Sequence, residues 1–334
     1  MRVLERAPEA FLDERGRPRF GSYVGSVARM DLSSLSGGRL ARIAREKRWL
    51  YVGIASEAEY VALLIARLGY VANVFAYVLD ARTMRMIATA STLAPPGSCE
   101  IADGTSAPTL AAYRFGRQRA RVERNHAGEL LVDADLGPIA IRATLATRDA
   151  PPAITAIAPV GPGGQALVNT TEKRALLAAT GELRVRGSHR PLRDALAGYD
   201  YTHGLLARRT AWRWAYALGH AKTGERVAFN IVQGFVGEPE CAAWVEGEVL
   251  PLAEGRFAFD PDNPLAEWRV STADGAVDLR FTPGGLHSEQ KNLGVIASRF
   301  VQPAGAYRGR MRVGGRELVL ERVLGVAEDQ DVLW

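Results

Sequence analysis

The feature that most constrains the fold is a succession of short segments in which apolar and polar residues alternate. The clearest covers residues 139–147. Ile139, Ile141 and Leu145 fall on odd positions, and Arg142 and Thr144 fall on the even positions between them. Successive side chains of a β-strand point to opposite faces, so this pattern predicts strands with one buried face. Similar segments recur from residue 49 to the end of the chain, between Gly-, Asn- and Asp-rich turns. The sequence therefore predicts an all-β protein.

Very little helix is expected. Residues 39–48 place Leu40 and Ile43 at helical spacing and predict one short helix. In the second half, only residues 191–197 suggest a helical turn.

The two halves of the chain repeat one another. Trp49 and Tyr51 match Trp214 and Tyr216, residues 61–65 match 227–231, and residues 76–78 match 243–245. Each pair is separated by about half of the 334-residue chain, which indicates a tandem duplication. Antiparallel meanders of this size usually protect their edges by closing into barrels, so two antiparallel β-barrels in tandem are predicted. A pair of β-sandwiches is the alternative.

Four parts are expected along the chain. An irregular N-terminal segment covers residues 1–38 and a first barrel covers 39–158. A Pro- and Gly-rich linker covers 159–168, and a second barrel covers 169–334.

Composition excludes several classes of protein. Apolar residues make up 47% and charged residues 24%, and the net charge of +5 is spread along the chain, which argues against nucleic-acid binding. Cys99 and Cys241 are the only cysteines, so neither a disulfide scaffold nor a zinc ribbon is expected. We expect no integral membrane segment and no signal peptide, and therefore a cytoplasmic protein.

Reactive and aromatic side chains concentrate between Tyr199 and Gly219. Asp200 is the first candidate for a catalytic role, because burial among aromatic rings would favour its protonated form and make it a general acid. Alternatively, Asp200 pairs with Arg208 or Arg209 and fixes a loop to the barrel rim. His203 is a candidate proton relay, or simply a turn residue before Gly204.

Other residues are candidates for binding or for structure. Six aromatic and amide side chains are expected to bind a ligand or to fill the core: Tyr201, Trp212, Trp214, Asn230, Gln233 and Trp244. Seven charged residues are expected to form structural ion pairs: Glu172, Lys173, Arg208, Arg209, Arg299, Glu328 and Asp329. The five histidines have no metal-ligand spacing, and no nucleotide-binding motif is present, so neither a metal nor a cofactor is expected.

Several motifs together resemble one family over essentially the whole chain. They are Lys47 to Trp49 with Tyr51, Asn169 to Lys173, Asp200 to Thr202 with Gly204, Arg208 to Trp214, Asn230 with Gly234 and Phe235, Ser298 to Gln302, and Gly325 to Trp334. The family is the one called domain of unknown function 2804. It is distantly similar to lipocalin-like two-barrel proteins that include carotenoid 1,2-hydratases and AttH-type proteins.

This resemblance implies two lipocalin-like barrels and a site for an apolar ligand. Two residues depart from the family pattern, since His203 stands where Arg is expected and Gln330 where His is expected. If that histidine is catalytic in relatives, this chain has lost or altered the activity.

Three functions follow as hypotheses. The favoured one is a protein that binds an apolar or lipid-like small molecule in a barrel. The second is a cofactor-independent hydratase, isomerase or cyclase that acts on an isoprenoid or other apolar substrate, with Asp200 as acid. The third is a structural or partner-binding protein with filled barrels. The sequence leaves binding and catalysis both open.

Overall fold

A computed structural model describes residues 3–28, 30–35, 37–161, 167–292 and 297–334. The elements in chain order are β1 (Glu5–Arg6), β2 (Gly21–Val24), η1 (Ser33–Leu35), α1 (Arg39–Arg45), β3 (Glu46–Ala55), β4 (Glu59–Arg67), β5 (Ala72–Asp80), β6 (Arg85–Ala94), η2 (Pro96–Ser98), β7 (Cys99–Ile101), β8 (Thr109–Phe115), β9 (Gln118–Arg124), β10 (Leu130–Asp135), β11 (Ile139–Ala146), β12 (Ile154–Pro159), β13 (Val168–Val185), β14 (Ser188–Leu205), β15 (Arg209–His220), β16 (Arg226–Gln233), η3 (Glu238–Glu240), β17 (Ala242–Val245), β18 (Glu248–Pro251), β19 (Gly255–Ala258), β20 (Trp268–Thr272), β21 (Val277–Asn292), β22 (Ala297–Val313) and β23 (Arg316–Leu333).

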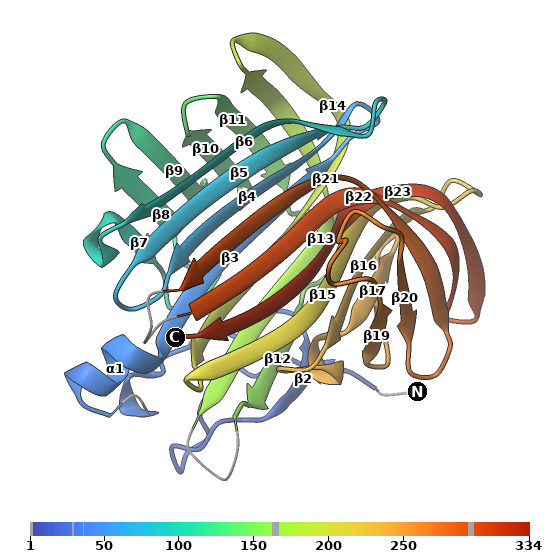
Figure 1. The fold of residues 1–334 in the computed structure, drawn as a ribbon. Coiled ribbons are helices and arrows are strands. Elements are labelled where there is room, and N and C mark those ends of the chain that lie inside the picture. Colours follow the sequence, from blue (N-terminus) through green and yellow to red (C-terminus); the bar gives the residue numbers. More distant parts are fainter. Residues whose placement is uncertain (1–2, 29, 36, 162–166, 293–296) are drawn as a thin grey trace.

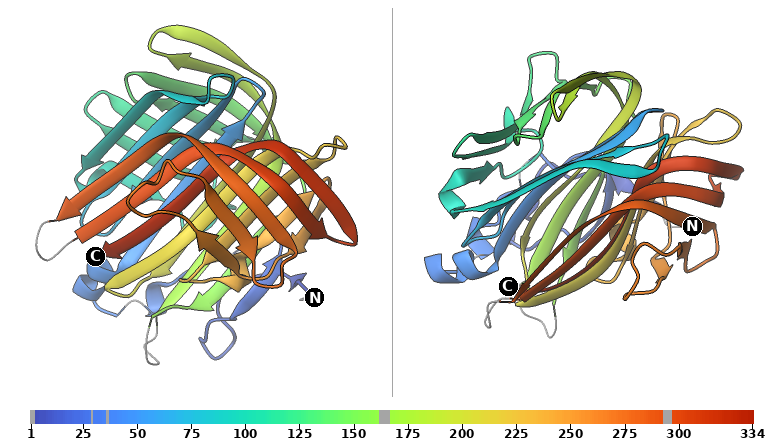
Figure 2. Two further views of the ribbon diagram at one scale, coloured as in Figure 1. Left: turned by 45° about the vertical axis from the view of Figure 1, so that its right-hand side comes forward. Right: turned by 45° about the horizontal axis from the view of Figure 1, so that its top comes forward.

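The strands form two curled sheets, which confirms the predicted all-β fold. The first has the order β6-β5-β4-β3-β14-β13-β11-β10-β9-β8-β7, and the second β18-β17-β16-β15-β23-β22-β21-β20-β19. Figures 1 and 2 show each sheet as a half-barrel, with β21 of the second lying beside β5 and β6 of the first. The predicted short helix is α1.

The internal repeat is visible in the strand order. The meander β3–β6 of the first sheet corresponds to β15–β18 of the second, and each meander continues into a long hairpin, β14/β13 or β23/β22. The repeated Trp and Tyr positions therefore lie on equivalent strands, Trp49 and Tyr51 on β3 and Trp214 and Tyr216 on β15.

The change from one sheet to the other falls between Leu205 and Arg209. The strands β13 and β14 come after the predicted linker, yet they pair with β11 and β3 of the first sheet. The centre of that linker, residues 162–166, lies outside the described residues. A domain boundary at 159–168 stays a prediction.

The helical turn predicted over residues 191–197 is wrong, because these residues belong to β14. The strand is irregular here: Asp194 has a φ of 47° and the pairing with β13 shifts register between Ala179 and Gly181. Such a bulge interrupts the alternation of apolar and polar residues, and in the sequence this interruption looks like a helical turn.

Two glycines allow the sheets to approach closely. Gly53 on β3 and Gly198 on β14 are direct cross-strand partners. A Cβ at residue 198 would lie 1.9 Å from the Tyr216 hydroxyl of the second sheet. The glycine pair thus makes room for an aromatic ring from β15.

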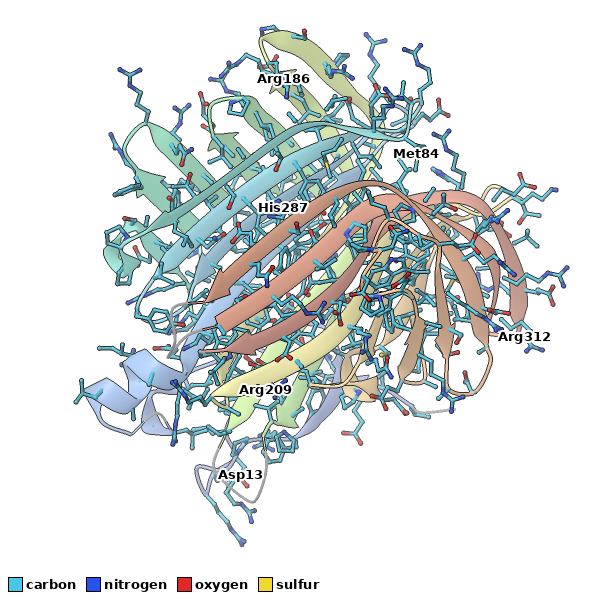
Figure 3. The ribbon with its side chains drawn as sticks, viewed as in Figure 1. Asp13, Met84, Arg186, Arg209, His287 and Arg312 are labelled. Atoms are coloured by element: carbon cyan, nitrogen blue, oxygen red, sulfur yellow. The ribbon has the colours of Figure 1, made fainter. Side chains whose placement is uncertain are left out.

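Further aromatic contacts cross between the sheets. His287 lies on β21 (Figure 3), and its ring and that of Phe75 on β5 have centroids 4.4 Å apart. No helix among the described residues is long and apolar enough to cross a membrane.

Candidate functional site

A cavity of about 300 Å³ lies between the two sheets. The first sheet lines it with residues of β3, β4, β5, β6, β13 and β14, and the second with residues of β15, β16, β21, β22 and β23. Most of the lining is apolar, and it includes Asp200, Trp212 and Trp214 from the stretch that the sequence singled out. The site is therefore shared by both halves of the repeat.

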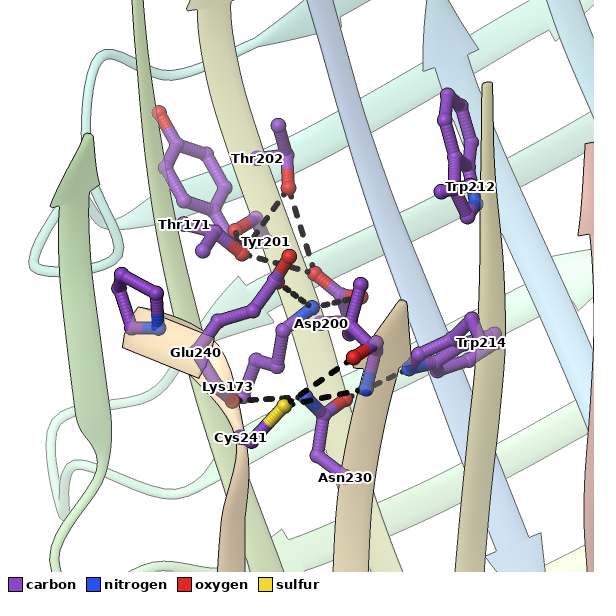
Figure 4. Close-up of polar contacts among 12 residues, drawn as sticks. Thr171, Lys173, Asp200, Tyr201, Thr202, Trp212, Trp214, Asn230, Glu240 and Cys241 are labelled. Carbon is purple, nitrogen blue, oxygen red and sulfur yellow. Dashed lines mark hydrogen bonds and ion pairs between the residues drawn. The ribbon is translucent and has the colours of Figure 1, made fainter. Parts of the chain in front are cut away.

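Lys173 lies at the centre of the polar part of this wall. Its Nζ atom forms an ion pair with Asp200 on the neighbouring strand and a second one, 3.0 Å long, with Oε2 of Glu240 (Figure 4). Asp200 Oδ1 also accepts hydrogen bonds from Thr171 and Thr202, at 3.3 and 3.4 Å. Asp200 thus pairs with Lys173, and the predicted alternative of a pair with Arg208 or Arg209 is wrong.

Burial and charge act in opposite directions on this cluster. Burial disfavours the ammonium of Lys173, but the carboxylates of Asp200 and Glu240 outweigh it and raise the pKa of Lys173. Burial raises the pKa of Glu240; Lys173 opposes the shift and Asp200 adds to it. Lys173 therefore stays charged and holds two carboxyl groups together.

Glu328 on β23 is a carboxyl group of a different kind. Oε1 accepts a 2.7 Å hydrogen bond from Trp212 Nε1, and Oε2 accepts one of 2.5 Å from Gln302 Nε2. The Tyr77 hydroxyl in turn donates to Gln302 Oε1 at 2.5 Å. Glu328 was predicted to form an ion pair. Among the described residues, however, no cation lies within ion-pair distance of it.

The environment of Glu328 favours its protonated form. Burial raises its pKa to about 7, with a smaller contribution from the negative charge of Asp200, while the bonds from Trp212 and Gln302 and the charge of Lys173 act against the shift. A carboxyl group that titrates near neutral pH can both donate and accept a proton at that pH.

Aromatic rings from both sheets form the apolar walls. Trp49 stacks on Trp212 with centroids 5.9 Å apart, and Tyr51 meets Trp214 edge to face at 5.2 Å. Phe235 lies 5.3 Å from Trp212. The repeated strands β3 and β15 thus face each other across the cavity.

Asn230 supports the site from behind and does not line it. Its Oδ1 accepts a 2.6 Å bond from Trp214 Nε1, and its Nδ2 donates 2.8 Å to the backbone oxygen of Glu240. Gln233 accepts a 3.3 Å bond from Arg213, and Trp244 donates 3.0 Å to the Pro152 backbone oxygen; neither lines the cavity.

Tyr201 and His203 point away from the cavity, because they alternate along β14 with Asp200 and Thr202. The Tyr201 hydroxyl donates 2.7 Å to the Ala102 oxygen. His203 is buried, with Nε2 2.9 Å from Glu46 Oε1, and burial lowers its pKa. His203 therefore lies on the wrong face to relay a proton to Asp200.

The remaining predicted ion-pair residues lie outside the cavity. Arg209 pairs with Asp331, both Arg299 and Arg213 pair with Asp329, and Arg208 donates to the Trp334 oxygen at 2.7 Å. Glu172 accepts bonds from the hydroxyls of Thr105 and Tyr199, at 2.7 and 2.6 Å, and has no cation within ion-pair distance among the residues described.

Sequence reasoning missed four cavity residues that matter. Glu240 and Gln302 complete the two polar clusters, Asn73 is a buried amide in the wall, and Trp49 stacks on Trp212. Trp49 carried a signal as the repeat partner of Trp214, and Gln302 ended one of the family motifs, whereas Asn73 and Glu240 carried none. Within the described part of the chain, no group of three or more His, Cys, Asp or Glu side chains is placed to hold a metal ion.

Comparison with known proteins supports this fold. The family model described as "Domain of unknown function (DUF2804)" matches residues 3–334. A structure of CghA with Sch210972 matches with a TM-score of 0.55 and 14% identity, over 98% of this chain and 97% of that chain. A protein of Nitrosomonas europaea described as AttH matches with a TM-score of 0.52 and 11% identity, over 86% and 92%.

Kievitone hydratase of Nectria haematococca has a TM-score of 0.47 at 14% identity, over 88% of this chain and 90% of that chain. No curated protein matches the sequence. At these identities the likeness concerns the fold, which is that of the lipocalin-like two-barrel proteins.

Proposed function

The chain belongs to the family called domain of unknown function 2804, and we propose that its cavity binds a small, largely apolar molecule and transfers a proton to it. Glu328 is the proposed proton donor. The reaction class is hydration, isomerisation or cyclisation driven by acid–base chemistry of side chains.

One observation carries this proposal: Glu328 is a buried carboxyl group in an apolar cavity, with two N–H donors and with no cation partner among the described residues. Burial raises its pKa to about 7, so the acid is partly protonated at neutral pH. When the proton leaves, the Trp212 and Gln302 N–H groups are already oriented toward the carboxylate oxygens and stabilise the new charge.

Asp200, the acid expected from the sequence, has a different proposed role. Its Oδ2 is bound to the Lys173 ammonium, so proton transfer from Asp200 would break a buried ion pair. We therefore assign Asp200 and Glu240 to positioning Lys173, and assign the proton to Glu328. In hydration, the water that adds to the protonated substrate returns a proton to the Glu328 carboxylate; in isomerisation or cyclisation, that proton comes from another carbon of the protonated intermediate.

A protein that only binds is the second candidate, favoured by the apolar lining of the cavity. The third hypothesis, a structural or partner-binding protein, requires barrels filled by side chains. A cavity of about 300 Å³ does not support it.

Solvent deuterium tests the proposal without a known substrate. The protein is incubated in D₂O with an extract of small apolar metabolites, and mass spectrometry looks for carbon-bound deuterium. We expect incorporation with the wild type, loss with Glu328→Gln, and no change with Glu317→Gln, which removes a half-exposed surface carboxylate that pairs with Arg310. Equal incorporation with Glu328→Gln would contradict the proton-donor role. Retention of a ligand without any exchange would favour binding alone.

A further inference from the structure

We propose that the cavity selects an apolar molecule that carries a protonated amine, with the ammonium group seated against the carboxyl group of Glu328. This inference rests on the binding half of the proposed function, namely that a small molecule occupies the cavity. It applies to the second candidate, binding without chemistry, because an ammonium that displaces the proton of Glu328 leaves that carboxylate no proton to donate. It adds the chemical class of that molecule.

The first observation is an unused hydrogen-bond acceptor. Asn73 on β5 lines the cavity with 7% of its surface exposed, and its Oδ1 atom has no hydrogen-bond partner among the described residues. A buried acceptor without a donor is unfavourable by about 1–3 kcal/mol, so the wall gains from a ligand that supplies N–H groups.

The second observation is a surplus of carboxyl groups. Four of them, Asp200, Glu240, Glu289 and Glu328, line one cavity together with a single ammonium, that of Lys173. Lys173 contacts Asp200 and Glu240, and Glu289 accepts a hydrogen bond from the Ser91 hydroxyl. Glu328 has no cation within ion-pair distance among the described residues, so a proton or a ligand neutralises it. An anionic ligand such as a fatty acid would add to the surplus, whereas a cation removes it.

The third observation is the aromatic lining, because ring faces attract cations. Trp214 already lies 5.9 Å from Lys173 Nζ, measured to the ring centroid. Trp212, which bonds the Glu328 carboxyl group, stacks on Trp49 and packs against Phe235, and all three rings line the cavity. Carboxylates combined with aromatic faces are the recognition chemistry of organic ammonium ions.

Charged and titratable groups near Glu328 come from five of the elements that line the cavity. Those that titrate or carry charge are Asp200 of β14, Lys173 of β13, Glu240 of η3, Tyr77 of β5 and Glu289 of β21. Burial raises the Tyr77 pKa well above its ordinary value, so this hydroxyl stays neutral. An ammonium ligand that binds therefore displaces mainly the proton of Glu328, and that proton should be released to the solvent.

Three probes of equal chain length test the inference on the full chain: octylammonium, 1-octanol and octanoate. Binding is followed by tryptophan fluorescence and by calorimetry in two buffers of different ionisation enthalpy. At about pH 8 we expect octylammonium to bind about tenfold more tightly than octanol and octanoate to bind most weakly. At about pH 6 the advantage should shrink, because the cation must then displace the proton, and proton release should rise toward one per ligand.

Two variants make the test specific. Glu328→Gln should keep octanol affinity and lose both the ammonium preference and the proton release, whereas Glu317→Gln should behave as the wild type. If octanol binds and octylammonium binds no better, the amine inference fails while ligand binding stands. Tighter binding of octanoate would also overturn it. If no probe binds, the amine inference and the proposed use of the cavity fail together.

Discussion

The indole Nε1 of Trp212 donates a 2.7 Å hydrogen bond to Oε1 of Glu328, from one strand of the second sheet to the next. The same indole ring stacks on Trp49 of the first sheet, with centroids 5.9 Å apart. Trp212 therefore links the contact between the sheets to a cavity carboxyl group that titrates near neutral pH.

Glu328 should make the protein less stable as the pH rises. The folded carboxyl keeps its proton up to about pH 7, while the unfolded one loses it near its ordinary value of 4.5. Between these values the folded state binds more protons, so the free energy of unfolding falls with increasing pH, by about 3 kcal/mol in total. Urea unfolding at a series of pH values measures this slope.

Glu328→Gln removes the titrating group and should flatten that part of the pH profile. At about pH 8 the variant should be more stable than the wild type by up to about 3 kcal/mol, because no charge is left buried. The surface variant Glu317→Gln serves as the control, and its profile should parallel that of the wild type. A Glu328→Gln profile that also parallels the wild type would show that Glu328 is ionised throughout.

Lys173→Met should be strongly destabilising. The variant leaves Asp200 and Glu240 buried without the ammonium that holds both, and losing one partner of a buried ion pair lowers stability by about 3–5 kcal/mol. Adding Asp200→Asn to the variant should restore part of the loss, since one uncompensated charge disappears. A decrease below about 1 kcal/mol, the range of exposed pairs, would contradict this account.

Trp212→Phe should raise the pKa of Glu328 above about 7, because the ring loses the N–H that stabilises the carboxylate. Infrared spectroscopy of the protonated carboxyl band, followed against pH, measures the change. Trp268→Phe is the matched control, since Trp268 donates its N–H to the Pro264 oxygen and does not line the cavity. An unchanged midpoint in Trp212→Phe would mean that the indole bond does not stabilise the carboxylate.

Gly198→Ala should disrupt the contact between the sheets. The added Cβ would lie 1.9 Å from the Tyr216 hydroxyl and 2.5 Å from the Arg174 backbone oxygen. We expect a loss of about 3 kcal/mol or more, the range of severe overpacking. Gly247→Ala, where a Cβ meets nothing within 4 Å, should change stability by about 0.5 kcal/mol at most. Thermal unfolding of both variants compares them, and similar melting temperatures would contradict the role of the glycine.

Much of the fold could be predicted because its signals are local. Alternation along each strand follows from which face is buried, and the repeat of Trp49 and Tyr51 as Trp214 and Tyr216 indicated equivalent strands. The assignment of β13 and β14 to the first sheet could not be predicted from alternation. Which strand pairs with which depends on hydrogen bonds between residues far apart in the chain.

The candidate site was only partly predictable for the same reason. The stretch from Tyr199 to Gly219 was identified by its density of aromatic and charged residues, and Asp200, Trp212 and Trp214 do line the cavity. The phase of β14 then turns Tyr201 and His203 to the other face. In the sequence, Glu328 and Asp329 look alike, yet Asp329 pairs with two arginines and Glu328 faces the cavity.

The sequence by itself determined the all-β architecture, its duplication and the family, because periodicity and motifs are properties of the linear chain. The tertiary structure alone decided which acid is neutralised and which is left in an apolar environment. Asp200 meets Lys173 because β13 and β14 are neighbours, and Glu328 meets Trp212 and Gln302 because β15 and β22 flank β23. The pKa of a carboxyl group depends on its burial and its neighbours, and both are set by how the strands come together.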